Sequence, residues 1–213
     1  MKIAPTQLSE KEFSSLKNDI NKTLQDIRNG IVHAQGRKNT RNGKAGEIAV
    51  CKLLNFRNQD GTLYEQNGMG CDVPKSVVER SNLPKEFHHD IEIKYYEAKS
   101  GNLLGDASKK IKKLKKGLVL IKAFYDKTPD NPLPKIHIEK IVPNAEDLKA
   151  FEHMEKIVSF VKDKSNPIKG FGGTREKVKE ENKKLTSNRF YLNDNSNSKT
   201  NARQVQLCYK LNH

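Results

Sequence analysis

The sequence contains no tryptophan, and aromatic residues make up only 7% of its 213 residues. Hydrophobic residues reach 34%, which allows one modest core and leaves a wide polar surface. No apolar run approaches the length of about 18 residues that a membrane-spanning helix needs. The N-terminus turns polar at once, so we expect neither a membrane span nor a signal peptide.

Cysteine is also scarce. The three cysteines, Cys51, Cys71 and Cys208, lie far apart in the chain and form no CxxC pair. Such an odd and widely spaced set predicts neither a structural zinc site nor a disulfide framework. A reducing, cytoplasmic setting fits this cysteine usage best.

Positive charge is what the sequence has in excess. The chain carries 40 Lys and Arg against 26 Asp and Glu, which gives a net charge of +14 and a pI near 9.6. A surplus of this size attracts polyanions, because binding them releases counterions. Nucleic acid is the commonest polyanion for a basic protein without membrane spans, and a membrane surface is the competing partner.

The periodicity of the apolar residues predicts a mixed chain of helices and strands. Steps of three and four favour a helix over 8–31, opened by a capping box of Ser9 and Glu12. The basic segment 36–44 is predicted as a loop. Further helices are predicted at 44–55, 106–116, 148–161 and 174–186, and strands at 62–73, from 90 onward, and at 118–125, 135–142 and 204–211.

This order predicts an α/β fold of the α+β type, with a mixed central β-sheet flanked by helices. We expect one domain over 1–213, with its core at about 44–142. The segment 1–43 would be a helical addition, and 143–213 an extension for DNA recognition or dimerisation.

The central stretch DIEIKYYEAKSG, residues 90–101, spells apolar-acid-apolar-lysine twice. On a strand, this period-two pattern buries one face and sets a carboxylate beside an ammonium on the other. Metal-dependent phosphodiester cleavage uses such a pair, because the acid helps to hold a divalent cation and the lysine orients water or offsets phosphate charge. The alternative is a strand that carries two solvated salt bridges.

The order of elements resembles the core of the PD-(D/E)xK nuclease superfamily, which includes many restriction endonucleases and Holliday-junction resolvases. A helix with Glu47, a glycine-flanked strand end with Asp72, and the acid-x-lysine strand follow one another within residues 44–125. The resemblance implies a restriction-endonuclease-like core in which Asp72 matches the first metal-binding aspartate, Glu97 the second acid, Lys99 the lysine and Glu47 the helical acid. The family's usual proline before its first aspartate is replaced by Cys71.

Two registers compete for the catalytic pair. An odd step of five residues makes Glu92 and Lys94 face opposite to Glu97 and Lys99 on an unbroken strand, so only one pair can face a metal. The Ser-Gly turn after Lys99 favours Glu97 and Lys99. The better core residues that flank Glu92 favour the other register, for which Asp90 is a further candidate acid.

By this resemblance, Asp72, Glu97 and the backbone carbonyl of Ala98 would hold Mg²⁺, and Lys99 would position the attacking water. The lysines of the helix at 106–116 would contact DNA phosphates, and a solvated helix face is the alternative. The candidates are Lys109, Lys110, Lys112 and Lys113, together with Lys115 and Lys116.

The sequence therefore predicts a Mg²⁺-dependent DNA endonuclease, with a type II restriction endonuclease preferred. Cutting both strands of a symmetric site calls for a homodimer on double-stranded DNA, for which the helix at 9–31 offers an interface. A Holliday-junction or repair nuclease of the same superfamily stays open. So does a non-catalytic basic nucleic-acid-binding protein, for which the acid-lysine strand is coincidental.

Overall fold

The computed structural model describes residues 6–32, 38–64, 72–97 and 103–210, and the chain splits into two compact units. Unit 1 comprises Met1–Gly101 and Gly117–Ile141, and unit 2 comprises Asn102–Lys116 and Val142–His213. The lysine-rich helix that the sequence places in the core range 44–142 thus belongs to unit 2. The assignment of the whole chain to a single domain stays a prediction.

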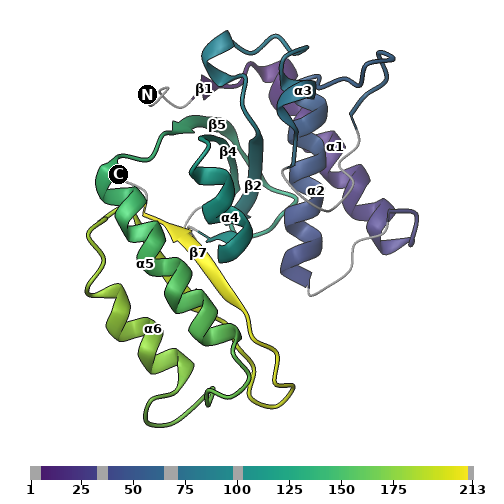
Figure 1. The fold of residues 1–213 in the computed structure, drawn as a ribbon. Helices are drawn as coiled ribbons and strands as arrows, with labels where there is room; N and C mark the ends of the chain where they lie inside the picture. Colours follow the sequence, from purple (N-terminus) through teal and green to yellow (C-terminus); the bar gives the residue numbers. More distant parts are fainter. Residues whose placement is uncertain (1–5, 33–37, 65–71, 98–102, 211–213) are drawn as a thin grey trace. The chain divides into compact units, whose positions relative to one another are not determined.

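Unit 1 is built on a four-stranded mixed sheet flanked by helices, which confirms the predicted α/β class (Figure 1). The strand order is β1-β5-β4-β2; β2 runs parallel to β4, and the other neighbours are antiparallel. The strands are β1 (Thr6–Gln7), β2 (Ile91–Glu97), β4 (Leu118–Tyr125) and β5 (Pro132–Ile141). The predicted strands from 90, at 118–125 and at 135–142 are confirmed.

The helices of unit 1 are α1 (Glu10–Arg28), α2 (Lys38–Leu53), α3 (Lys75–Val78) and the 3-10 helix η1 (Lys85–Phe87). The capping box of Ser9 and Glu12 opens α1 as the sequence predicts, with the Glu12 carboxylate accepting from the Ser9 N–H at 2.9 Å. The loop predicted at 36–44 is wrong, because α2 already begins at Lys38. The glycines of α2, Gly43 and Gly46, lower the stability of the helix by about 1 kcal/mol each in isolation. They lie where α2 approaches Tyr95 of β2.

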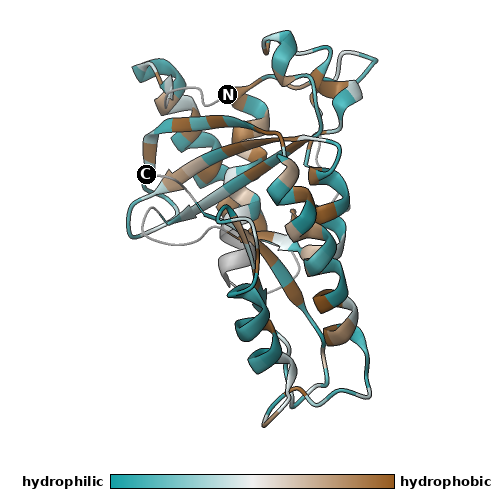
Figure 2. Cartoon of the chain, turned by 60° about the vertical axis from the view of Figure 1, so that its left-hand side comes forward, coloured by the Kyte–Doolittle hydropathy of each residue, from teal (hydrophilic) through white to brown (hydrophobic). Residues whose placement is uncertain are grey.

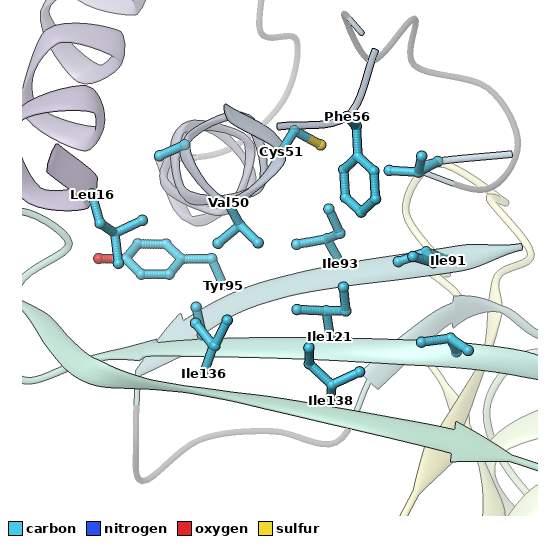
Figure 3. Close-up of a cluster of buried hydrophobic side chains, with 14 of the residues drawn as sticks. Leu16, Val50, Cys51, Phe56, Ile91, Ile93, Tyr95, Ile121, Ile136 and Ile138 are labelled. Atoms are coloured by element: carbon cyan, nitrogen blue, oxygen red, sulfur yellow. The ribbon is translucent and has the colours of Figure 1, made fainter. Parts of the chain in front are cut away.

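The core of unit 1 lies between one face of the sheet and the helices α1 and α2. Figure 3 shows Ile91, Ile93 and Tyr95 of β2 on the same side as Val50 of α2 and Leu16 of α1. The apolar stripe of α1 is thus buried inside its own unit, and whether this helix forms a dimer interface stays a prediction.

The strand predicted at 62–73 is not formed by the described part of this range, 62–64 and 72–73. These residues make only isolated bridges, Arg57 with Leu63 and Val73 with Ile91. The predicted break at Gly68 and Gly70 lies outside the described residues.

Unit 2 contains a three-stranded antiparallel sheet of order β3-β7-β6. The strands are β3 (Leu103–Asp106), β6 (Phe190–Asp194) and β7 (Val205–Tyr209), and the helices are α4 (Ala107–Leu114), α5 (Ala145–Lys162) and α6 (Thr174–Asn182). The three predicted helices and the last strand are confirmed, whereas β3 and β6 were not predicted. Across the described ranges of both units, no helix has the length and apolarity that crossing a membrane requires.

Candidate active site

The alternation of side chains along β2 decides which acid-lysine pair belongs to which face of the sheet. Ile91, Ile93 and Tyr95 point into the core beneath α2 (Figure 3). Because successive side chains alternate, Glu92 and Lys94 project from the other face. Glu97 has the parity of the core-facing residues, so it faces opposite to Glu92 and Lys94, as the odd spacing predicts.

Asp72 is fixed at the outer edge of β2. Val73 and Ile91 exchange two backbone hydrogen bonds, at 3.1 and 2.8 Å, which set Asp72, the residue before Val73, beside the strand. The Ile93 N–H then donates to Asp72 Oδ2 at 2.6 Å. The N–H and C=O of one strand residue point to the same side, so the carbonyl of Ile93, between Glu92 and Lys94, faces the same edge as Asp72.

Lys94 joins two acids. Its Nζ lies 2.6 Å from Glu92 Oε1 on the same strand and 3.8 Å from Glu47 Oε1 on α2. Glu92 exposes only 2% of its side-chain surface, and Glu47 and Lys94 expose 17% and 18%. The lysine is therefore the counter-ion that offsets the cost of placing these carboxylates together out of water.

A close approach of helix and strand puts Glu47 within reach of Lys94. A Cβ added at Gly46 would lie 1.9 Å from Cγ of Tyr95, so only glycine lets α2 come this near to β2. The next residue along the helix is Glu47. The close packing of Gly46 against Tyr95 thus sets the separation between the Glu47 carboxylate and the Lys94 ammonium.

The charges of the site shift one another's pKa values. Burial raises the pKa of Glu47 to about 7; Lys94 opposes the rise, and the carboxylates of Asp72 and Glu92 add to it. Burial works against the charged form of Lys94, but Glu92, Glu47 and Asp72 outweigh it and raise the pKa of that ammonium above its usual range. At neutral pH, Lys94 is therefore charged and Glu47 is poised between its two forms.

Comparisons with protein-family models, curated proteins and solved structures found no match. The function must therefore be argued from the site itself.

The structure brings together Glu47, Asp72, Glu92 and Lys94, which is the alternative register of the sequence prediction. Glu97 lies four residues beyond Ile93 on β2, about 13 Å further along the strand, and is not brought to Asp72. The structure thus sets the triplet 92–94, and not Glu97, beside Asp72, and which acid-lysine pair is catalytic stays a prediction. Lys99 and Ala98 lie outside the described residues.

Asp90 has a structural role in this arrangement. Its Oδ1 accepts from the N–H of Lys75 at 3.0 Å, at the start of α3. The first turn of a short helix thus gains a partner for one of its free N–H groups. This contact accounts for an acid at position 90 without a catalytic role.

The donor chemistry of the site fits a hard divalent cation, because carboxylate and carbonyl oxygens are the ligands that Mg²⁺ prefers. Asp72, Glu92 and the Ile93 carbonyl would hold it. Among the residues that the structure describes, no three His, Cys, Asp or Glu side chains are drawn close enough to enclose a metal ion. Lys94 occupies the position between Glu92 and Glu47 and supplies the positive charge there.

The predicted phosphate-binding lysines of α4 do not share one exposed face. Lys109 and Lys112 are exposed, but Lys110 is buried, and its stem packs near Gly105. The Nζ of Lys113 is buried and makes no hydrogen bond. Lys115 pairs with Glu155 at 2.9 Å. A helix of eight residues that packs on its own unit must turn part of its lysine set inward, which the run of lysines did not reveal.

Two features of the site were missed from the sequence. Gly46 gave no signal beyond being a glycine inside a predicted helix, which often marks a close packing contact. The sequence does carry a signal for the role of Ile93, because its side chain is strongly apolar. A strand that buries Ile91 and Ile93 must present Glu92 and Lys94 on its other face.

Proposed function

We propose that the protein is a Mg²⁺-dependent DNA endonuclease that uses Asp72, Glu92 and Lys94, assisted by Glu47. The observation that carries the proposal is the placement of Asp72 against Ile93, the residue between Glu92 and Lys94, by a 2.6 Å hydrogen bond. This geometry supports the resemblance to the PD-(D/E)xK nucleases at the level of side chains. It does so with the acid-x-lysine triplet at 92–94 in place of 97–99.

Each residue has a distinct task in this proposal. The charged ammonium of Lys94 stabilises negative charge on the scissile phosphate and orients the attacking water. The Glu47 carboxylate, with its pKa raised to about 7, accepts a proton from that water at neutral pH; the bond from phosphorus to the leaving 3′ oxygen breaks, and solvent water protonates that oxygen. When bound by Asp72, Glu92 and the Ile93 carbonyl, Mg²⁺ supplies Lewis-acid polarisation of the phosphate and lowers the pKa of the water.

The finer assignment to a type II restriction endonuclease, acting in the cytoplasm as a homodimer on a specific duplex site, remains part of the proposal. A Holliday-junction or repair nuclease would use the same site on a substrate of a different shape. The dimer needs a surface other than the apolar stripe of α1, which is buried in unit 1.

The test is the cleavage of long duplex DNA with Mg²⁺ by the wild type, Glu92→Gln and Glu97→Gln. Both substitutions remove one carboxylate charge from the same strand, so they are matched. We expect Glu92→Gln to lose at least about 100-fold in rate and Glu97→Gln to stay near wild type. Equal activity of the two variants, or loss in Glu97→Gln alone, would refute the register proposed here.

The second candidate function is a nucleic-acid-binding protein without catalysis. It is favoured by one observation, the absence of a ready-made metal cluster among the described His, Cys, Asp and Glu residues. It predicts that wild type shifts DNA in a gel but cuts no linear, branched or single-stranded substrate with any divalent ion.

A further inference from the structure

Unit 2 contains a groove between α6 and β6 that the nuclease site does not use. Figure 2 shows α6 mostly in the hydrophilic colour, and four of the five residues that α6 and its C-cap contribute to the groove are polar or charged. The side chains that carry the argument come from both walls: Arg175, Lys179 and Lys183 from α6 and its C-cap, and Tyr191, Asn193 and Asn195 from β6 and the residue after it.

The lysines of α6 fall into two groups. Lys177 and Lys184 pair with Glu181 at 3.1 and 2.7 Å, so their charge is offset inside the unit. Lys179 and Lys183 are exposed, line the groove and form no ion pair with any residue that the structure describes. The lysines outside the groove are thus neutralised by Glu181, whereas Lys179 and Lys183 in the groove are available to an anionic partner.

The groove cations follow the helix axis at a regular spacing. Arg175, Lys179 and Lys183 are four residues apart, which places successive cations about 6 Å apart and the outer two about 12 Å apart. One strand of duplex DNA advances 3.4 Å per nucleotide, so the row spans about three to four nucleotide steps. Arg175 is anchored, since its Nη2 donates to the Ser196 carbonyl at 3.0 Å.

The β6 wall of the groove carries a chain of amides. Asn193 and Gln206 are cross-strand partners on β6 and β7. Asn193 Nδ2 donates to Asn195 Oδ1 at 3.2 Å, and Asn195 Nδ2 donates to Gln206 Oε1 at 2.6 Å. Such a chain holds the amides in place while leaving donors and acceptors at its ends, and amides of this type form paired hydrogen bonds with adenine edges.

The acid in the groove is Asp194, and its hydrogen bonds to neighbours reduce its repulsion of an anionic ligand. Asp194 accepts from the Thr174 hydroxyl at 2.6 Å and from the Ser196 N–H at 2.8 Å, so its carboxylate is engaged by neighbours.

Hydrogen bonds between α6 and β6 hold the two walls of the groove together. The Asn182 amide bonds both the N–H and the C=O of Leu192, at 2.9 and 2.8 Å, and thereby fastens α6 to the edge of β6.

We propose that the groove between α6 and β6 binds duplex DNA, with Arg175, Lys179 and Lys183 on phosphates and the Asn193–Asn195 pair towards base edges. Unit 2 carries 20 Lys and Arg against 10 Asp and Glu, a net charge of +10. Amides beside a row of cations match a partner that presents phosphates next to base edges. This inference rests on the proposed endonuclease function, because it names the surface that holds the nuclease's substrate.

The test compares Lys179→Gln/Lys183→Gln with Lys149→Gln/Lys156→Gln in the full chain. The control lysines are exposed on α5 of the same unit and lie outside the groove, so both variants lose the same charge. Binding to a 30-base-pair duplex is followed by fluorescence anisotropy over a range of salt concentrations without Mg²⁺. Circular dichroism and thermal unfolding check that each variant is folded.

We expect the groove variant to bind about tenfold more weakly and its log-log salt slope to fall by about 1.8, which corresponds to two lost phosphate contacts. The control should change much less in both respects. Equal weakening of the two variants would overturn the inference, because net charge alone would then explain binding. Tighter binding of single-stranded RNA than of the duplex would overturn the choice of partner.

The cleavage assay keeps this inference separate from the proposed function. A wild type that binds duplex DNA through the groove but never cuts would refute the nuclease and leave the groove standing. A wild type that cuts, with the groove variant cutting as fast at limiting DNA concentration, would refute the groove and leave the nuclease standing.

Discussion

The two units balance their charged residues to different extents. Unit 1 has 20 Lys and Arg against 16 Asp and Glu, and it buries charges in pairs, such as Lys94 with Glu92 and Lys122 with Glu139. Unit 2 has the same number of cations, half as many acids as cations and fewer residues. Buried, paired charges can be tuned for chemistry, whereas exposed cations in excess supply affinity for a polyanion.

The pKa values of one glutamate in each unit illustrate this difference in charge environment. Burial raises the pKa of Glu47 to about 7, with the nearby acids adding to the rise against Lys94. Hydrogen bonds from Lys184 and then Lys177 lower the pKa of Glu181 to about 2. The same side chain is thus held near its titration point in unit 1 and kept fully ionised in unit 2.

The strongest test of this division, chemistry in unit 1 and DNA binding in unit 2, is Asp72→Asn. This substitution should abolish cleavage and leave the binding of duplex DNA intact. The amide oxygen of Asn can still accept from the Ile93 N–H, so the strand edge is kept while the negative charge is lost. We expect a rate loss of about 1,000-fold or more, with the duplex affinity without Mg²⁺ within about threefold of wild type. Parallel loss of both would show that one surface performs both tasks.

A second test concerns how tightly unit 1 is built. Gly46→Ala forces a methyl group into the Tyr95 ring and should lower the free energy of unfolding by about 3 kcal/mol or more. Gly43→Ala is the matched control in the same helix, because its Cβ would meet the Tyr95 carbonyl oxygen at an ordinary 3.7 Å. Urea unfolding measures both.

Gly43→Ala should be neutral or stabilising by up to about 1 kcal/mol, since alanine favours the helix. Where Gly46→Ala still folds, its cleavage rate should fall as well, because α2 carries Glu47 away from Lys94. Unchanged stability and activity in Gly46→Ala would contradict the close packing.

The smallest expected effect is the pH dependence caused by Glu47. Its folded-state pKa is raised from 4.5 to about 7, so between these values the folded chain binds more protons than the unfolded chain. Stability is therefore lost as the pH rises through this window. Relative to Glu47→Gln, wild type should lose on the order of 3 kcal/mol between pH 4 and pH 8.

Unfolding in urea across that pH range measures the difference. Glu152→Gln, an exposed position on α5 of unit 2, serves as the control. A constant difference between wild type and Glu47→Gln from pH 4 to pH 8 would show that Glu47 titrates as an ordinary carboxyl.

Elements with strong local signals were predictable. The capping box of Ser9 and Glu12 fixes the start of α1, and the apolar run of Leu118–Tyr125 is β4 with the predicted bounds. The start of α2 was not predictable, because its basic, glycine-containing first turns follow no helical pattern. Its closeness to Tyr95, where glycine is required, is a tertiary contact that no local rule expresses.

The site was half predictable. Asp72 and Glu47 were chosen from the order of elements, and the structure places both near Lys94. The turn after Lys99 favours Glu97 and Lys99, whereas the packing of Ile91 and Ile93 favours the register that the structure sets beside Asp72. Burial of two isoleucines favours one face far more strongly than a turn signal does, at about 1.5 to 3 kcal/mol for each side chain.

The contact between Asp72 and Ile93 also protects the sheet. β2 is an edge strand, and the free N–H and C=O groups of an edge are a template for pairing with another chain. Val73 engages the edge groups of Ile91, and the Asp72 carboxylate takes the next N–H along. Asp72→Ala would therefore remove an acid from the site and also expose the Ile93 N–H to pairing with another chain. Asp72→Asn removes the charge but keeps an acceptor for that N–H, so it is the better variant for obtaining an inactive protein that does not self-associate.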